Sequence, residues 1–393
     1  MRTCLFVHDF RSYTFKDKTY STNLSYDILK DRYLSHFDKL KILNRTKCVC
    51  ENPSTSMVLS SGDGVEFLNE IDFFSGIDFF QKYSKYKKIV IDEVSASCFV
   101  IIRLDSFLGL IAADACRKLN KPYLIEVAGC VWDSFWNKGI LGKLIAPWLF
   151  AKTRYVIRNA NHVIYVTDNF LQKRYPTLGK NIACSNVMLP DIDYDMVLTK
   201  RIKHIDESRK IIKIATIASI DVPYKNQEAV IRALGVLKRR GILNYSYELI
   251  GGGDSKRLHK IAMLEGVLDE VVFVGSVKHQ KIRSILDDID IYIQPSKQEG
   301  LPRSLVEAMS CGCYCIGSDV AGIPELLDKD TIFSVHSQKQ LVDKILDFNK
   351  ESAKDKAIQN IKKSRKYICT TLEKRRYNFI SEAIDESGGF SES

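Results

Sequence analysis

Short apolar runs alternate with longer amphipathic stretches along most of the 393 residues. Runs of this length predict buried strands, and the amphipathic stretches between them predict helices. The strands expected in the first half are Cys4–Val7, Leu40–Leu43, Cys98–Ile102, Tyr123–Val127 and His162–Val166. Those expected in the second half are Ile211–Ile217, Tyr245–Ile250, Val271–Val274, Ile289–Ile293 and Tyr314–Gly317. This alternation is typical of α/β layers built around parallel sheets.

The chain is too long for one ordinary core, and its pattern changes near Pro190. We therefore expect two Rossmann-like, doubly wound domains over residues 1–190 and 211–336, joined by a polar connector over 191–210. Ligands of such sheets bind beyond the carboxyl ends of the strands, so the two domains would face a central cleft. Residues 337–393 are expected to form further helices and end in a frayed tail.

The segment from residue 295 to residue 309 carries the strongest chemical signal. Glu299 lies in a loop directly after a predicted strand, and Glu307 lies on the second turn of a helix over 302–309. Pro302 suits the first helical position because its missing N–H would be unpaired there. The unpaired N–H groups and the positive dipole end of such a helix bind phosphate. The two carboxylates could then hold sugar hydroxyls on either side of a diphosphate, as a sugar nucleotide requires.

This segment, followed by Gly322-Ile323-Pro324-Glu325, resembles the donor-site signature of the retaining glycosyltransferases of the group 1 family. That signature is two glutamates separated by seven residues, then a turn of small residues and Gly-x-Pro-Glu. The resemblance implies the GT-B fold, with the helices over 337–386 reaching back to the N-terminal domain. It also implies a nucleoside-diphosphate sugar as the donor. A bare Glu-x7-Glu would equally fit an ordinary βα unit with two solvated glutamates.

The resemblance assigns roles to particular donor-side residues. Glu307 would hold the ribose, Glu299 a hydroxyl of the donor sugar, and Lys225 the diphosphate. Backbone N–H groups would come from Gly300 and Leu301.

Two glycine turns belong to the same expected site. Gly252 lies in a Gly251-Gly252-Gly253 turn where missing side chains let a ligand approach the backbone. Gly275 ends the next predicted strand and resembles the turn of the family that flanks the nucleobase. The triple glycine is not the dinucleotide-binding Gly-x-Gly-x-x-Gly, because Lys256 stands where the last glycine should be.

One position departs from the family. Its members carry a Gly-Arg pair shortly before the lysine, whereas this chain has Ala218-Ser219. A serine cannot replace the forked hydrogen bonds of a guanidinium to phosphate. Either Lys225 and the helix start suffice for the diphosphate, or another residue compensates, for which Arg303, in the first turn after Pro302, is the candidate.

The N-terminal half, which is expected to bind the acceptor, resembles the family less clearly. The stretches around Arg103 and over 121–129 are similar to the branch of the family found in capsule, exopolysaccharide and O-antigen assembly. Ala128 stands where many members have a histidine close to the donor sugar. Polar candidates on this side are Arg103, Glu126 and Asp133, and Glu126 on its apolar strand could also be a structural carboxylate. His8, at the end of the first strand, is likewise open to a structural reading.

Composition narrows the choice of cofactor and compartment. The eleven cysteines show no paired metal-binding spacing, so we expect reduced structural thiols. No Asp-x-Asp stands in a strand-end loop as a seat for a divalent metal, and metal-independent transfer without a cofactor is expected. No signal-peptide pattern and no membrane-length apolar run is present, which favours the cytoplasm.

The net charge of +10 bears on the partners. Residues 138–180 hold eight Lys or Arg against Asp168 alone, namely Lys138, Lys143, Lys152, Arg154, Arg158, Lys173, Arg174 and Lys180. The same region carries Ile140, Leu141, Leu144, Ile145, Trp148 and Leu149. This combination suits peripheral docking on the anionic inner face of a membrane, although the apolar positions could instead pack inside the domain. No nucleic-acid-binding motif is recognisable.

Together these features predict a retaining hexosyltransferase. It would extend a glycan or a polyprenyl-diphosphate-linked acceptor from a nucleotide-sugar donor in capsule, exopolysaccharide or O-antigen synthesis. One alternative is a non-catalytic sugar-nucleotide-binding partner in polysaccharide assembly, which would bind the donor without transfer. Another is a GT-B sugar-nucleotide epimerase, which would need histidines and carboxylates around the site, although none of the seven histidines lies between Glu299 and Glu307.

Overall fold

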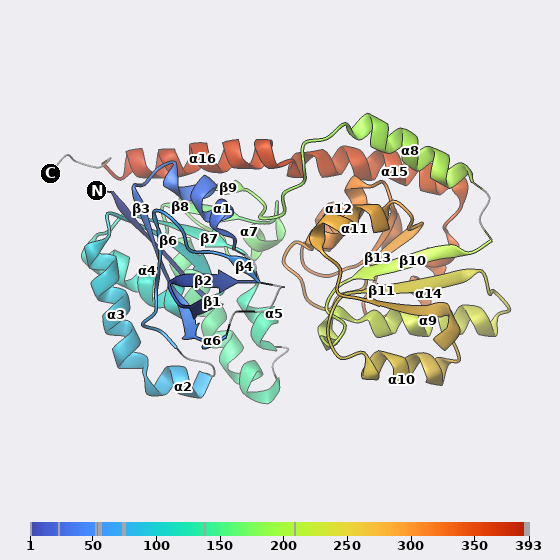
Figure 1. Cartoon of the computed structure of the whole chain (residues 1–393), viewed down its shortest axis with the longest axis horizontal. Coiled ribbons are helices and arrows are strands. Elements are labelled where there is room, and N and C mark those ends of the chain that lie inside the picture. Colours follow the sequence, from blue (N-terminus) through green and yellow to red (C-terminus); the bar gives the residue numbers. More distant parts are fainter. Residues whose placement is uncertain are drawn as a thin grey trace. The chain divides into compact units, whose positions relative to one another are not determined.

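The computed structural model describes residues 2–22, 24–51, 53, 57–72, 76–136, 139–207 and 210–388. The chain forms two compact units (Figure 1). The first unit contains Met1–Cys184 and Glu373–Ser393, and the second contains Ser185–Leu372.

The first unit is built on one mixed sheet of nine strands. Its strands are β1 (Thr3–Phe15), β2 (Lys18–Ser21), β3 (Lys39–Cys48), β4 (Val58–Leu59), β5 (Val65–Leu68), β6 (Phe99–Leu104), β7 (Tyr123–Val127), β8 (His162–Tyr165) and β9 (Lys180–Ala183). The parallel strands run in the order β5-β3-β1-β6-β7-β8-β9, while β2 and β4 add an antiparallel extension beside β1. The order therefore reverses direction between β1 and β6.

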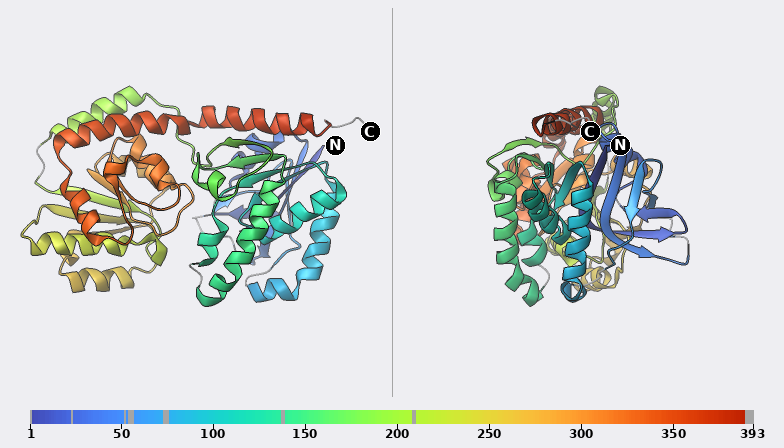
Figure 2. Two further views of the ribbon diagram at one scale, coloured as in Figure 1. Left: turned by 180° about the vertical axis from the view of Figure 1, so that it is seen from behind. Right: turned by 90° about the vertical axis from the view of Figure 1, so that its left-hand side faces the viewer.

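Helices cover both faces of this sheet. Its helices are α1 (Tyr26–Leu29), η1 (Lys30–Leu34), α2 (Gly76–Gln81), α3 (Tyr83–Ala96), α4 (Phe107–Leu119), α5 (Val131–Trp136), α6 (Gly139–Arg158), α7 (Phe170–Arg174) and most of α16 (Cys369–Glu386). Helices α3, α4 and α6 lie side by side on one face, as Figure 2 shows from behind. On the other face Phe6 meets Tyr33 of η1, and His162 meets Phe379 of α16. Because side chains alternate along a strand, neighbouring residues of one strand serve different faces.

The second unit holds a six-stranded parallel sheet. Its strands are β10 (Ile212–Ile217), β11 (Tyr245–Ile250), β12 (Val271–Gly275), β13 (Ile291–Gln294), β14 (Tyr314–Ser318) and β15 (Ile332–Phe333). They lie in the order β12-β11-β10-β13-β14-β15, which is a doubly wound sheet that reverses between β10 and β13. The loops after β10 and β13 therefore border a ligand crevice of the kind found in open α/β sheets.

Helices and short turns connect these strands. They are α8 (Tyr194–Asp206), η2 (Pro223–Lys225), α9 (Gln227–Arg239), α10 (Lys256–Glu265), η3 (Leu268–Glu270), α11 (His279–Leu286), α12 (Arg303–Ser310), α13 (Ile323–Leu326), η4 (Lys329–Thr331), α14 (Gln338–Leu346), α15 (Lys350–Ser364) and η5 (Arg365–Tyr367). The ten strands predicted from the sequence are all present, with ends shifted by a few residues and with β1 and β3 extended beyond their apolar runs.

The expected domain boundaries need two corrections. The connector over 191–210 contains α8, which packs on α15 and belongs to the second unit. Arg201 of α8 is buried and donates to the carbonyl oxygens of Leu286, Ile289 and Cys311, so this polar stretch is part of the fold. The region 337–393 also divides, because α14 and α15 pack within the second unit and only the residues from Glu373 onward belong to the first. Residues 389–393 of the expected frayed tail lie outside the described part.

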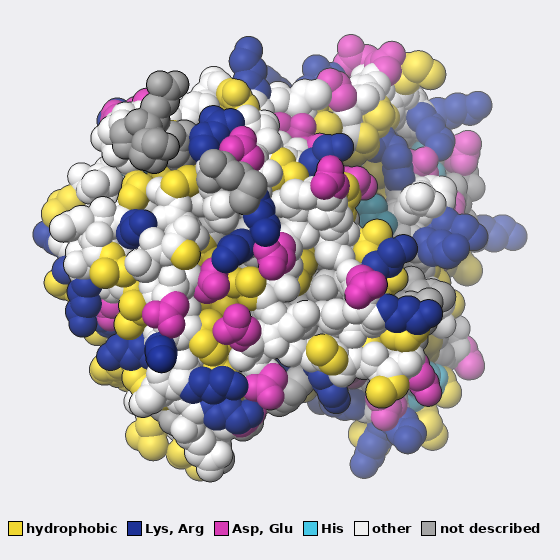
Figure 3. All heavy atoms as spheres, turned by 60° about the vertical axis from the view of Figure 1, so that its left-hand side comes forward, with side chains coloured by type: hydrophobic (Ala, Val, Ile, Leu, Met, Phe, Trp, Pro, Cys, Tyr) yellow, Lys and Arg dark blue, Asp and Glu magenta, His cyan; other side chains and the backbone are white. Residues whose placement is uncertain are grey.

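The cysteines are reduced thiols, and the surface carries charges of both signs (Figure 3). All eleven cysteines are free thiols, and most are buried. Figure 3 shows a face of the protein on which Lys and Arg side chains are interspersed with Asp and Glu. No helix within the described ranges combines the length and the apolar character that crossing a membrane requires.

Candidate functional site

A hollow of about 360 Å³ opens beside the loops that follow β10 and β13. It is lined by Ile217, Lys225, Val277, His279, Ile282, Glu299, Leu301, Pro302, Arg303, Ser304 and Glu307. Five residues predicted from the sequence to bind the donor therefore line one hollow: Lys225, Glu299, Leu301, Arg303 and Glu307.

The position of Lys225 is set by a short turn. Asn226, which follows it, has a φ of 57°, a left-handed conformation that asparagine tolerates better than most residues. The buried Asn226 side chain donates to the carbonyl oxygen of Pro295 at 3.0 Å, which ties the loop after β10 to the loop after β13. This turn brings Nζ of Lys225 to 2.7 Å from Oε1 of Glu299.

Glu299 is fixed by buried neighbours. Its Oε1 also accepts hydrogen bonds from Oγ of Ser296 at 2.7 Å and from Nε2 of Gln294 at 3.0 Å. Gln294 is oriented in turn by the hydroxyl of Tyr292, which donates to its Oε1 at 2.8 Å. The Glu299 side chain is 10% exposed, and its Oε2 accepts nothing from the described residues. One carboxylate oxygen is therefore held by the protein, while the other has no hydrogen-bond donor among the described residues.

The start of α12 provides backbone donors. Pro302 is the residue before the helix, with φ −72° and ψ 116°, rather than its first residue, so the predicted start is corrected by one position. No side chain caps this end of α12, and within the described structure the N–H groups of Gly300 and Leu301 donate to no partner. The carbonyl of Gly300 accepts from the N–H of Gly322 at 3.1 Å, so the Gly-Ile-Pro-Glu segment supports the loop. The exposed Arg303 lies on the rim.

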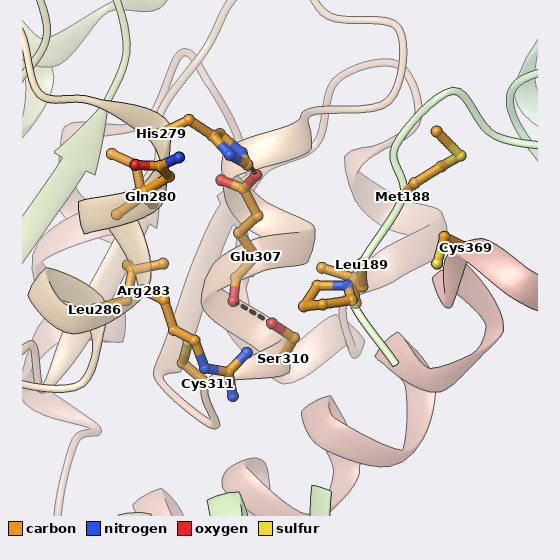
Figure 4. A pocket seen from close by; sticks show the side chains of 12 residues that line it. Met188, Leu189, His279, Gln280, Arg283, Leu286, Glu307, Ser310, Cys311 and Cys369 are labelled. Atoms are coloured by element: carbon orange, nitrogen blue, oxygen red, sulfur yellow. Dashed lines mark hydrogen bonds and ion pairs between the residues drawn. The ribbon is translucent and has the colours of Figure 1, made fainter. Parts of the chain in front are cut away.

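Glu307 projects from the second turn of α12 between two hollows. Nε2 of His279, at the start of α11, lies 2.8 Å from its Oε1. A second hollow of about 470 Å³ shares His279, Ile282 and Glu307 with the first (Figure 4). Its other walls are mainly apolar and include Leu189, Leu286 and the side chain of Arg283. Sequence reasoning missed His279, and its place just after the Gly275 turn was the only signal for it.

Gly252 and Gly275 are not among the residues that line these two hollows. In the first of these turns a Cβ on Gly251 would lie 2.0 Å from the carbonyl oxygen of Ala218, and one on Gly252 would lie 2.4 Å from Oγ of Ser276. Gly275 has a φ of 79° and open space where a Cβ would point. Close approach of the backbone to Ala218 therefore explains Gly251, whereas the positive φ of Gly275 is what favours glycine there.

Two acceptor-side candidates form a buried ion cluster instead of a pocket. Glu126 points to the α16 face of the sheet, where it accepts from Nη2 of Arg103 at 2.7 Å, Nη1 of Arg376 at 3.1 Å and the hydroxyl of Tyr33 at 2.9 Å. Burial alone raises the pKa of Glu126, but the three guanidinium groups of Arg103, Arg376 and Arg32 outweigh it and lower the pKa to about 2. The structure favours the structural reading of Glu126, and it corrects the expectation that Arg103 faces an acceptor.

The other polar candidates at the strand ends of the first unit also have partners. Asp133, the third acceptor candidate, pairs with Nη2 of the half-buried Arg174 at 3.2 Å. Asp9, at the reversal point of the first sheet, accepts from the N–H groups of Phe107 and Leu108 at 2.7 and 3.1 Å and so occupies the start of α4. His8 lies beside it, with Nε2 3.6 Å from Oδ1 of Asp105. Asp105 has a φ of 86°, a rare conformation that often marks functional sites.

Comparisons with known proteins indicate the family of this chain. The family model described as Glycosyl transferases group 1 matches residues 200–365. Protein CapJ of Staphylococcus aureus is 33% identical over 332 residues, which cover 84% of this chain and 82% of CapJ. The amylovoran biosynthesis glycosyltransferase AmsK of Erwinia amylovora is 32% identical over 130 residues, 31% of each chain.

Solved structures show the same architecture. HepE of Anabaena, solved in complex with UDP, superposes with a TM-score of 0.65 at 14% identity over 97% of this chain and 100% of its own. At this identity the likeness concerns the fold alone. With its Glu299–Glu307 segment, the match to the family model and the extended identity to CapJ, this chain belongs to the group 1 glycosyltransferases and has the GT-B fold.

Proposed function

We propose that this protein is a retaining, metal-independent glycosyltransferase that uses a nucleoside-diphosphate sugar as its donor. The observation that carries the proposal is the convergence of Lys225, Glu299, Glu307 and the uncapped start of α12 on one hollow. Each of these groups suits a different part of a sugar nucleotide.

The hollow is lined by both charged and apolar side chains. Lys225, Arg303 and the N–H groups of Gly300 and Leu301 would hold the diphosphate, as helix starts and cations do in other phosphate sites. Glu307, supported by His279, would accept from the ribose hydroxyls. Val277, Ile282 and Ile217 offer apolar surface for the base. Oε2 of Glu299 would accept from a hydroxyl of the donor sugar.

The proposed transfer depends on stabilising the negative charge that develops on the leaving diphosphate. In a front-face transfer, the bond between the anomeric carbon and the β-phosphate oxygen breaks while the acceptor oxygen bonds to the same face of that carbon. The acceptor proton passes to the departing phosphate oxygen, so atoms and charge balance without a protein base. The protein then contributes positioning and stabilisation of the leaving diphosphate, the task of Lys225 and the start of α12.

For the acceptor, we propose a growing glycan or a polyprenyl-diphosphate-linked oligosaccharide of a bacterial surface polysaccharide. The named role of AmsK in amylovoran biosynthesis supports this class of product. HepE was solved with UDP-glucose, which makes a UDP-hexose a reasonable first donor to test. A cytoplasmic site of action belongs to the same proposal.

A donor screen tests the proposal. The purified protein is incubated in EDTA with UDP-, GDP-, ADP- and CMP-sugars, and its melting temperature and the release of nucleoside diphosphate are measured. One donor should raise the melting temperature and be hydrolysed slowly, and NMR of a transfer product should show the donor's anomeric configuration.

Variants give this screen its controls. Lys225→Ala should lower turnover about 10²- to 10³-fold, whereas Lys256→Ala, which removes an equal charge at the exposed start of α10, should not alter it. Donor binding without turnover, even with lipid-linked acceptor extracts, would instead indicate a sugar-nucleotide-binding partner. An inverted product or a requirement for metal would overturn the mechanism.

A further inference from the structure

Helix α6 carries apolar side chains on two different sides. The inner side, with Ala146, Leu149, Val156 and Ile157, is buried in the core of the first unit. The outer side exposes Ile140 by 80%, Leu141 by 72%, Leu144 by 71% and Trp148 by 60%. The apolar positions predicted to share one helix face are therefore divided, and Ile145 and Leu149 pack inward.

The outer residues form one continuous stripe. Positions 140, 141, 144 and 148 follow the spacing of a single helix face, and the exposed Tyr155 extends it by two turns. Trp136, just before α6, is also exposed and stacks on Trp132 at 5.0 Å. Contiguous apolar surface of this kind on a folded protein marks an interaction site.

The charged residues of α6 indicate what kind of surface the stripe binds. No Asp or Glu occurs in α6, which carries Lys143, Lys152, Arg154 and Arg158. Nζ of Lys152 pairs with Oδ2 of Asp114 at 2.7 Å. Nζ of Lys143 instead lies 5.6 Å from the centre of the Trp136 ring, at the edge of the stripe. The mixed charges seen in Figure 3 are absent from this helix. Lys138 and the rest of 137–138 lie outside the described residues.

We propose that the outer face of α6, defined as Ile140, Leu141, Leu144, Trp148 and Trp136 with Lys143 and Arg154, docks on an anionic lipid surface. A helix with an apolar stripe and a basic rim lies in the plane of the bilayer surface with its apolar side in the headgroup region. Each Lys or Arg close to anionic lipid adds about 1 kcal/mol, and Trp prefers the boundary. A second copy of this protein would bring the same positive rim against itself.

This docking goes beyond the transfer reaction. The docking rests on the proposed function only for its biological purpose, because a lipid-linked acceptor would be presented at the same membrane surface. The donor hollow belongs to the other unit and shares no residue with α6. Vesicle binding and donor hydrolysis can therefore fail separately.

Vesicle sedimentation tests the proposal on the full chain. Vesicles of phosphatidylcholine are compared with vesicles of equal parts phosphatidylcholine and phosphatidylglycerol, at low and at high salt. We expect binding to the anionic vesicles only, weakened by salt, with a blue shift of tryptophan fluorescence. Leu144→Ser with Trp148→Ser should weaken the binding about tenfold or more, because two apolar side chains no longer enter the lipid.

Two controls separate docking from general effects. Met263→Ser with Leu264→Ser removes two equally exposed apolar side chains from α10 and should leave vesicle binding unchanged. Lys143→Gln with Arg154→Gln should reduce both the affinity and its salt dependence. All these variants should keep the donor-induced thermal shift.

Three results would overturn the proposal. The first is equal binding to neutral and anionic vesicles, and the second is unchanged binding by the Leu144→Ser, Trp148→Ser variant. The third is a concentration-dependent dimer, seen without vesicles and abolished by that variant, which would assign the face to a second copy.

Discussion

The two sheets reverse their strand order in the same way, yet their reversal points are filled differently. In the first unit the helix that follows the reversal, α4, is capped by Ser106, and its N–H groups also meet the Asp9 carboxylate. In the second unit the equivalent helix, α12, begins after Pro302 without any side-chain cap. The first unit thus supplies its own anion at the helix start, whereas no described side chain does so at the start of α12.

Carboxylates in the two units differ in the same sense. Glu126 meets Arg103, Arg376 and Tyr33 and is sealed inside the first unit. Glu299 meets Lys225 through one oxygen and keeps the other toward a hollow. Packing therefore satisfies both oxygens of Glu126 but only one oxygen of Glu299 among the described residues. The following predictions test this contrast.

Replacing Glu126 should have the largest effect, and it should be on stability. Glu126→Gln leaves buried guanidinium groups without their counter-charge, which costs about 3–5 kcal/mol in comparable pairs. Urea unfolding should show this loss, while the donor-induced thermal shift of the folded fraction persists. A variant as stable as the parent would mean that the cluster is not structural.

Acid should reproduce part of that loss. The pKa of Glu126 in the folded protein is lowered from its ordinary 4.5 to about 2. Between pH 4.5 and pH 2 the unfolded chain therefore binds more protons than the folded protein. Stability should therefore fall as the pH drops from 4.5 toward 2, and Glu126→Gln should flatten this part of the profile. Unfolding curves across that range, in both proteins, provide the measurement; parallel profiles would contradict the assignment.

Lys225→Ala should act on turnover. In the proposed mechanism the lysine stabilises the negative charge that develops on the leaving diphosphate. Deleting a comparable transition-state contact lowers kcat about 10²- to 10³-fold. Steady-state kinetics should show this with the Tm close to that of the parent, and Lys225→Arg should restore part of the rate. If kcat stayed normal and only KM rose, the lysine would serve ground-state binding.

Glu307→Ala should act mainly on donor affinity. Loss of a charged acceptor for the ribose hydroxyls predicts a rise of about 10- to 100-fold in the donor KM. His279→Gln, which keeps a hydrogen bond to Glu307, should raise KM far less than His279→Ala. Equal, small changes in all three variants would remove Glu307 from the donor site.

Asp9→Ala should have the smallest effect. Loss of a carboxylate from a helix start typically costs about 1 kcal/mol. A small drop in Tm, with the donor kinetics unchanged, would confirm that the first unit uses this position for stability. A loss of transfer without a loss of stability would instead place Asp9, and with it His8 and Asp105, in the acceptor site.

The sequence by itself determined the layers and one half of the site. Apolar runs such as Cys4–Val7 and Tyr245–Ile250 form strands because burial of both faces of a parallel sheet requires them. Glu299 and Glu307 could be named from the sequence because the loop and helix that carry them are adjacent in the chain, whereas Lys225 was named through the family resemblance.

Tertiary structure alone decided the rest. The link between Glu299 and Lys225, the contact of His279 with Glu307 and the burial of Glu126 all join residues that are far apart in sequence. The same apolar positions of α6 could pack or face solvent until the neighbouring helices were placed. Periodicity fixes which residues share a side of an element, but only packing determines whether that side is covered.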